Sequence, residues 1–149
     1  MSAPLVQRLR PEWIDYNGHL SEAYYVLIFG FATDALMDRV GLGADYRAAS
    51  GCSLYTVEAH VRYLHEVAAD AEVEVHTRVG AGPDRPGTRK ARLCHEMRVG
   101  GVLAATEELM VLHVDQEQGR AVPFPDEVAA QLADLAEPAP GYAGRAVGR

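Results

Sequence analysis

The sequence predicts an α+β domain in which an antiparallel sheet wraps around one long central helix. Residues 23–32 form the longest apolar run, and apolar side chains nearly surround this part of a helix over 21–40, so most of it should be buried. From residue 52 the hydrophobic period changes to two, which indicates consecutive strands. Because such a sheet leaves an open edge and an uncovered face, we expect a homodimer or homotetramer.

Turn and capping residues set the expected element boundaries. Pro11 ends a first strand over 5–10, Ser21 is suited to cap the long helix, and Gly51 closes a short helix. We expect that short helix over 44–50, strands from 52 and over 71–79, 89–99 and 102–115, a hairpin at 100–101 and an amphipathic helix over 126–136. The domain is predicted to span 1–136, with a mobile tail over 137–149.

Composition excludes several classes of function. The net charge of −7 without a basic block argues against a nucleic-acid partner. A ten-residue apolar run is too short for a membrane span, which needs about 20 residues, and no signal peptide is visible. Cys52 and Cys94 lack metal-ligand spacing and are interpreted as reduced core thiols. We therefore expect a cytoplasmic protein with no metal site and no membrane partner.

The loop before the long helix carries the best candidates for chemistry. It reads Trp-Ile-Asp-Tyr-Asn-Gly-His-Leu over 13–20, with Asp15 four residues before His19 and Gly18 between them. The first N–H groups of a helix have no internal partner and carry partial positive charge. An aspartate there can be held as an anion, and a substrate carbonyl can be polarised there. A purely structural role for Asp15, as a turn or capping residue, fits the same pattern.

The loop and the strand order resemble the hotdog fold, in its 4-hydroxybenzoyl-CoA thioesterase-type branch. The family pattern Asp-x-x-Gly-His, a hydrophobe, two small polar residues and an aromatic is matched at Asp15, Gly18, His19, Leu20, Ser21, Glu22 and Tyr25. The resemblance covers residues 3–115 and departs at Ser21 and Glu22, where the family often has asparagines. It implies an acyl-CoA thioesterase, and because coenzyme A is part of that substrate, no separate cofactor is expected.

Within this family the segments 13–20, 51–60 and 105–110 resemble the betainyl-CoA thioesterases of carnitine degradation. These also occur fused to L-carnitine dehydrogenase. The resemblance implies hydrolysis of betainyl-CoA to betaine and CoA, with an L-carnitine dehydrogenase as a possible partner. A thioesterase for aromatic or medium-chain acyl-CoA, and a non-catalytic acyl-CoA-binding module that assists a dehydrogenase, remain as alternatives.

The resemblance also implies roles for the loop residues. Asp15 is expected to act as general base or nucleophile, and His19 to orient it or contact the thioester. Asn17 is a candidate for positioning water, and Gly18 lets the backbone approach the substrate. The main donor to the thioester carbonyl oxygen is expected to be a backbone N–H near the helix start, around Tyr24 or Tyr25.

Three further groups are candidates for substrate binding. A quaternary ammonium favours aromatic faces, which Trp13, Tyr16, Tyr24, Tyr55 and other tyrosines offer, although core packing explains several of them equally well. The best basic cluster for CoA phosphates consists of Arg89, Lys90 and Arg92. The alternative is that these charges only protect an exposed edge strand from pairing with another chain. Alternation in the strand from 52 places two sets of side chains on opposite faces: Tyr55, Val57, Ala59, Val61 and Tyr63 on one, and Glu58 and His60 on the other. Glu58 and His60, together with Glu107 and Glu108 of a neighbouring strand, form a candidate polar cluster.

Overall fold

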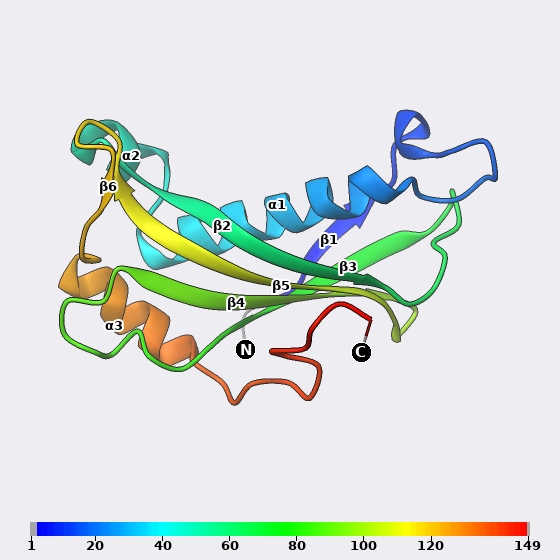
Figure 1. Cartoon of the computed structure of the whole chain (residues 1–149). Coiled ribbons are helices and arrows are strands. Elements are labelled where there is room, and N and C mark those ends of the chain that lie inside the picture. Colours follow the sequence, from blue (N-terminus) through cyan, green and yellow to red (C-terminus); the bar gives the residue numbers. More distant parts are fainter. Residues whose placement is uncertain (1–2, 149) are drawn as a thin grey trace.

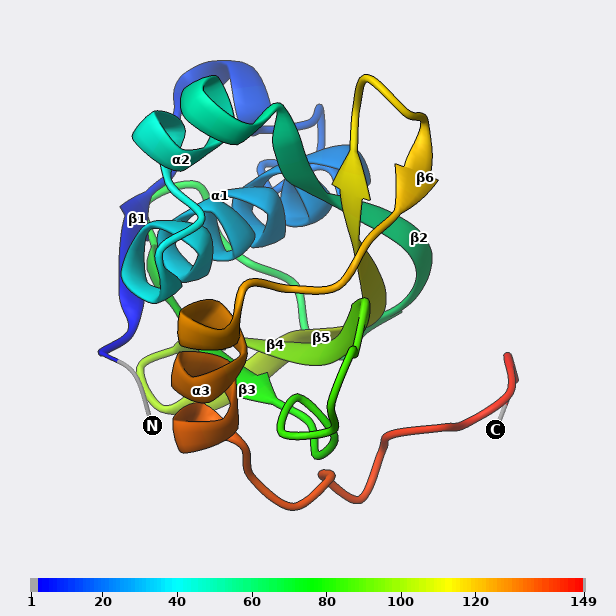
Figure 2. The same cartoon turned by 90° about the vertical axis from the view of Figure 1, so that its left-hand side faces the viewer.

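The computed structural model describes residues 3–148 and shows a curled sheet with the helix α1 lying across its concave face (Figures 1 and 2). The helices are η1 (Pro11–Trp13), α1 (Glu22–Val40), α2 (Ala44–Ser50) and α3 (Asp126–Leu135); the strands are β1 (Leu5–Arg8), β2 (Cys52–Tyr63), β3 (Glu72–Val79), β4 (Lys90–Val99), β5 (Val102–Asp115) and β6 (Arg120–Ala121). The sheet order is β1-β3-β4-β5-β2, with β6 added to β5, and all pairings are antiparallel. The element order expected from the sequence is confirmed.

The core between α1 and the sheet consists of two apolar clusters separated by polar side chains. One cluster surrounds Phe29 in the first half of α1, and the other surrounds Leu36 in its second half. Between them lies His95 of β4, which is fully buried, with its two ring nitrogens 2.8 Å from the hydroxyls of Thr33 and Thr77. Burial lowers the pKa of His95 to about 3, so the ring is neutral in the folded protein.

One face of α1 lies outside the core, which corrects the expectation that most of the apolar run is buried. Val26 and Leu27 are exposed, whereas Tyr25, Ile28 and Phe29 are buried against the sheet. The sheet curls around only one side of the helix, as Figure 2 shows, so within residues 3–148 the exposed apolar side chains on the other side have no covering element. An uncovered apolar helix face of this kind is a typical contact surface for another subunit.

A β-bulge at Val57 corrects the expected alternation of β2. Thr56 pairs with Val111 of β5, but Glu58 pairs with its neighbour Met110, so Val57 is the extra residue. On one side of the bulge Tyr63 faces α1; on the other, Tyr55 faces the convex side of the sheet. The sequence expectation that these two tyrosines share a face is therefore wrong.

The segment 137–148 lies along the convex face of the sheet (Figure 1). The hydroxyl of Tyr142 donates a hydrogen bond to Glu96 (2.8 Å), and the N–H of Gly144 donates to Glu108 (2.8 Å). Glu96 also pairs with Arg78 at 2.8 Å, so a buried carboxylate joins this segment to the sheet. The predicted mobility of the tail stays a prediction.

Candidate functional site

Asp15 lies in a tight turn that is tied to the start of α1. Its N–H donates to the carbonyl of His19 (2.9 Å), and its carbonyl accepts from Gly18 (3.0 Å), which has a φ of 81°. This left-handed backbone conformation is one that glycine adopts without strain, which explains the Gly at that position. The N–H of Leu20 donates to Val67 (2.8 Å), and this bond fixes the turn against the segment after β2.

The Asp15 carboxylate is held by one oxygen. Oδ1 accepts hydrogen bonds from the N–H groups of Asn17 (2.9 Å) and His19 (3.3 Å). Within residues 3–148 the other oxygen, Oδ2, has no hydrogen-bond partner, and the side chain is half-buried. The turn therefore orients the carboxylate and leaves one oxygen available for chemistry.

Asp15 lines a cavity of about 270 Å³ together with Asn17, His19, Leu20, Glu22, Tyr25, Tyr63 and Glu66. The rings of Tyr25 and Tyr63 meet edge to face at 5.0 Å and form an aromatic wall. His19 Nε2 lies 3.3 Å from Glu66 Oε2, and burial raises the pKa of Tyr25, so this hydroxyl stays protonated. Three carboxylates and one histidine give the cavity an acidic lining that suits a positively charged group.

The start of α1 supplies backbone donors beside this cavity. Ser21 is the N-cap residue, but its side chain makes no capping hydrogen bond among the described residues. The N–H of Tyr24 donates to the Ser21 carbonyl (3.0 Å), so it is already engaged. The N–H groups of Glu22 and Ala23 precede the first intrahelical bond and have no partner within the helix. They are therefore the candidate donors to the carbonyl oxygen, one turn or less before the expected position at Tyr24 or Tyr25.

The other aromatic candidates lie apart from the cavity. Trp13 is 5% exposed and packs in the core against Tyr24, with ring centroids 6.0 Å apart. Tyr16 is 98% exposed at the tip of the turn, and Tyr55 lies on the convex face, where its hydroxyl accepts a hydrogen bond from Gln116 (3.0 Å). Glu22 adjoins the loop in sequence, and Tyr63 is one of several aromatic candidates there. The pattern does not single out Glu66, because its approach to Asp15 depends on a tertiary contact between distant segments.

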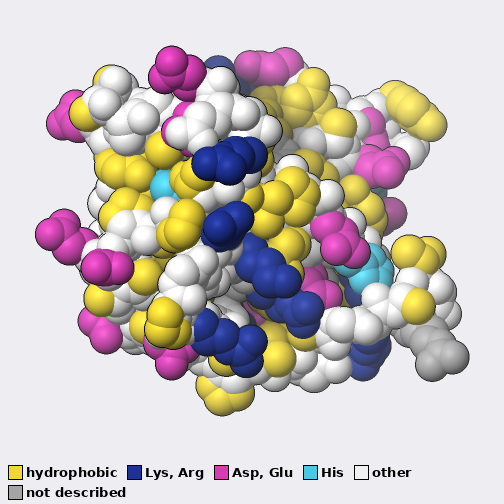
Figure 3. All heavy atoms as spheres, turned by 60° about the vertical axis from the view of Figure 1, so that its left-hand side comes forward, with side chains coloured by type: hydrophobic (Ala, Val, Ile, Leu, Met, Phe, Trp, Pro, Cys, Tyr) yellow, Lys and Arg dark blue, Asp and Glu magenta, His cyan; other side chains and the backbone are white. Residues whose placement is uncertain are grey.

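The basic cluster lies at the opposite end of the sheet. Lys90 and Arg92 line a second cavity beside the 80–88 loop, together with Arg85. Lys90 pairs with Leu112 of β5, whereas Tyr63 of the Asp15 cavity pairs with Ala105 of the same strand. These two positions of β5 are seven residues, or ~23 Å, apart. Figure 3 views the side of the molecule that carries the 80–88 loop and shows Lys and Arg side chains in a row. Within one chain, these residues are thus far from Asp15.

The candidate polar cluster is divided between the two faces of the sheet. Glu58, His60 and Glu108 line a small cavity on the convex face, together with Arg92, which lies 3.4 Å from Glu108. Glu107 points the other way, toward α1, because successive strand residues face opposite sides. Within residues 3–148 no group of three or more His, Cys, Asp or Glu side chains is placed to hold a metal ion.

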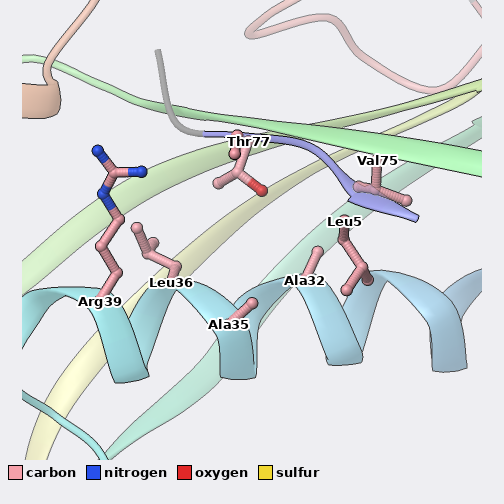
Figure 4. Close-up of a pocket in the computed structure, with 8 residues that line it drawn as sticks. Leu5, Ala32, Ala35, Leu36, Arg39, Val75 and Thr77 are labelled. Carbon is pink, nitrogen blue, oxygen red and sulfur yellow. The ribbon is translucent and has the colours of Figure 1, made fainter. Parts of the chain in front are cut away.

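A further cavity, of about 160 Å³, lies between α1, β1 and β3 (Figure 4). Leu5, Ala32, Leu36 and Val75 make it mostly apolar, and Arg39 stands at the end nearer the helix C-terminus. Its lining within residues 3–148 has no carboxylate, and the hydroxyl of Thr77 is engaged with His95 (2.8 Å), whereas the Asp15 cavity contains both a free carboxylate oxygen and an aromatic wall. The Asp15 cavity is therefore the better candidate for the active site.

Comparison with known proteins identifies the family of this chain. The family model "Thioesterase-like superfamily" matches residues 9–132. The chain belongs to this superfamily. The thioesterase-like chain also aligns with a Staphylococcus aureus protein solved in complex with CoA, at a TM-score of 0.85 and 23% identity over 98% of this chain and 94% of that one. The curled sheet around α1 is thus the hotdog fold that the sequence resemblance implied.

Closer relatives of this thioesterase-like chain carry specific names. It is 44% identical to a betainyl-CoA thioesterase from Pseudomonas aeruginosa, over 93% of this chain and 89% of that protein. It is 43% identical to an L-carnitine dehydrogenase/betainyl-CoA thioesterase from Agrobacterium fabrum, over 91% of this chain but 28% of that protein. A crystal structure of a candidate thioesterase from Pseudomonas putida KT2440 aligns with a TM-score of 0.79 and 41% identity, over 96% of this chain and 93% of that one. Within residues 3–148 no helix is long and apolar enough to cross a membrane.

Proposed function

We propose that this thioester hydrolase cleaves betainyl-CoA to betaine and CoA in the cavity around Asp15. The observation that carries the proposal is the carboxylate at the start of α1, held through Oδ1 with Oδ2 free, inside an acidic cavity walled by Tyr25 and Tyr63. A quaternary ammonium cannot donate strong hydrogen bonds, and aromatic faces and carboxylates are its natural partners. The P. aeruginosa relative, aligned over most of both chains, supports the same substrate.

Asp15 supplies the basic or nucleophilic group in this proposal. The thioester carbonyl lies between Oδ2 and the backbone donors at the start of α1, which polarise its oxygen as negative charge develops there. Water deprotonated by Oδ2, or Oδ2 itself, attacks the carbonyl carbon, and CoA leaves as the thiolate. In the second route water then hydrolyses the mixed anhydride, so both routes yield betaine and CoA.

Release of free CoA thiol in a colorimetric assay tests the function. We expect kcat/KM for betainyl-CoA to exceed that for a medium-chain acyl-CoA and for an aromatic acyl-CoA by at least about tenfold, because the acidic cavity attracts a cation and penalises an uncharged chain. If the medium-chain or the aromatic acyl-CoA were the better substrate, the enzyme would belong to that substrate class instead. Binding of acyl-CoA without release of the thiol would refute the hydrolase activity and support a non-catalytic acyl-CoA-binding module.

We also infer that the active unit is a dimer joined through β2. This edge strand has twelve residues and exposes Tyr55, Val57 and Tyr63, whereas the other edge, β1, has four residues. Long, exposed, apolar edge strands favour pairing with a second chain. Antiparallel pairing about a two-fold axis would bring the partner's basic end, with Arg89, Lys90 and Arg92, toward the Asp15 end of this chain. CoA phosphates would then bind to one subunit and the thioester to the other.

Two matched edge variants test this dimer. We expect light scattering to give twice the chain mass of 16.2 kDa for the wild type and for Val6→Lys on β1, but the mass of one chain for Val57→Lys on β2. Both valines are about half exposed, so the variants differ mainly in which edge is charged. A fully active wild-type monomer would refute the shared site.

The fused relatives support a functional link with an L-carnitine dehydrogenase. In those proteins the two activities named lie on one chain, so we propose that a separate dehydrogenase works together with this hydrolase. We place both in the cytoplasm, where reduced thiols such as the free Cys52 and Cys94 persist.

A further inference from the structure

A carboxyl group lies on the core face of the sheet, where the two apolar clusters meet. Glu107 of β5 is 5% exposed and stands directly opposite His95 of β4 and Val61 of β2. Directly opposed residues of antiparallel strands point to the same face. Ala105 and Leu109, the neighbours of Glu107 on that face, are buried in the core. The carboxyl therefore points into the space between the sheet and α1.

The Glu107 carboxyl has no partner within residues 3–148: neither a hydrogen-bond donor nor a basic side chain contacts it, and burial alone raises its pKa to about 7. The polar residue beside it, His95, has both ring nitrogens engaged by threonine hydroxyls. The oxygens of Glu107 keep some exposure to solvent. Among the described residues, the side-chain oxygens that are fully buried and make no hydrogen bond belong to Glu108 and Glu137. A nearly buried, unpaired carboxylate is strongly unfavourable unless it takes up a proton or a ligand supplies the missing charge.

The position of Glu107 connects it to the Asp15 cavity through Tyr63. Tyr63 lines that cavity and pairs with Ala105, and Glu107 is the next residue of β5 on the same face, ~7 Å farther along. Burial first, and then the charges of Glu22 and Glu107, raise the pKa of Tyr63, so the carboxyl acts electrostatically on the cavity wall. The exposed face of α1 and the edge strand β2 leave this side open in a single chain.

We propose that Glu107 is the counter-ion for the cationic end of the acyl group, with the Tyr63 ring as the adjoining aromatic face. This inference rests on the proposed function and adds a specificity-determining residue to it. In betainyl-CoA one methylene group separates the ammonium from the carbonyl carbon, so the cation must lie beside the Asp15 site, where Tyr63 stands. A bound cation favours the ionised carboxylate, and the substrate thereby supplies the partner that the chain lacks.

A pair of substrates that differ only in charge tests this role. Replacing the ammonium nitrogen of betainyl-CoA by carbon gives 3,3-dimethylbutanoyl-CoA, which has the same shape without the charge. We expect Glu107→Gln to lower kcat/KM for betainyl-CoA by about 10- to 100-fold, mostly through KM, and to change kcat/KM for the neutral isostere by less than about threefold. Glu107→Asp, which keeps the charge, should recover part of the loss.

Glu74→Gln is the matched control, because it makes the same change at an exposed carboxylate of the same sheet. It should leave both substrates unaffected. Equal losses for both substrates in Glu107→Gln would show that Glu107 only supports the fold and would overturn the proposal. Unchanged selectivity would overturn it as well, while a wild type that hydrolyses betainyl-CoA would leave the proposed function standing. A wild type that hydrolyses neither substrate would refute the proposed function itself.

Discussion

Asp15→Asn is expected to lower kcat for thioester hydrolysis by at least about 100-fold, the usual contribution of a positioned base. The change removes the negative charge and the basicity of Oδ2. The amide oxygen of Asn can still accept the N–H groups of Asn17 and His19, as Oδ1 does. The turn should therefore survive, and the midpoint of thermal unfolding should stay within about 2 °C of the wild type. Steady-state kinetics and a thermal melt measure the two effects separately.

Asp134→Asn provides the control, because it makes the same substitution at an exposed position on α3. It should retain wild-type kcat and stability. If Asp15→Asn kept kcat within a few-fold of the wild type, Asp15 would be a turn residue only, and the catalytic group would have to be sought among the other carboxylates of the cavity. A large drop in the unfolding midpoint would instead reveal a structural role.

Glu107→Gln is expected to change how stability depends on pH. Burial raises the pKa of Glu107 to about 7 from its ordinary value of 4.5, so between these values the folded protein holds a proton that the unfolded chain has lost. The contribution of this group to stability is complete below pH 4.5 and is lost as the pH rises through 7. The Gln variant does not titrate. Its free energy of unfolding relative to the wild type should therefore rise by about 3 kcal/mol between pH 4.5 and pH 8.

Urea unfolding at pH 4.5, 6 and 8 measures this difference. His95 acts in the opposite direction, because its pKa of about 3 in the folded protein means that stability is lost as the pH falls below its ordinary 6.5. This effect is common to both proteins and cancels in the comparison. Glu74→Gln, at an exposed carboxylate, should run parallel to the wild type. A Glu107→Gln curve parallel to the wild type would mean that the carboxyl is ionised at no cost in the folded protein.

The fold was largely predictable because its signals are local. The long apolar run before Gly41, the change of period at residue 52 and the glycine pair at 100–101 each depend on neighbouring residues. The turn around Asp15 was predictable for the same reason, since Asp, Asn and Gly at that spacing form their hydrogen bonds among themselves.

The walls of the site could not be predicted in this way. Tyr63 and Glu66 reach Asp15 only because the segment after β2 is bonded to the turn through Val67. The sequence pattern also offers no means to distinguish Trp13, which is buried in the core, from an aromatic residue that lines a cavity. The facing of Glu107 and Glu108 depends on strand register, which only the assembled sheet defines.

The extra residue at Val57 makes β2 tolerant of the loss of a single codon. Removing Val57 would leave Thr56 and Glu58 as consecutive residues opposite Val111 and Met110, so every other pair with β5 is kept and Tyr55 still faces the convex side. Relatives that lack this residue would then present the same aromatic side chains to the acyl group. Changes in residue type, rather than changes in length at this point, are therefore the route by which substrate preference diverges among such chains.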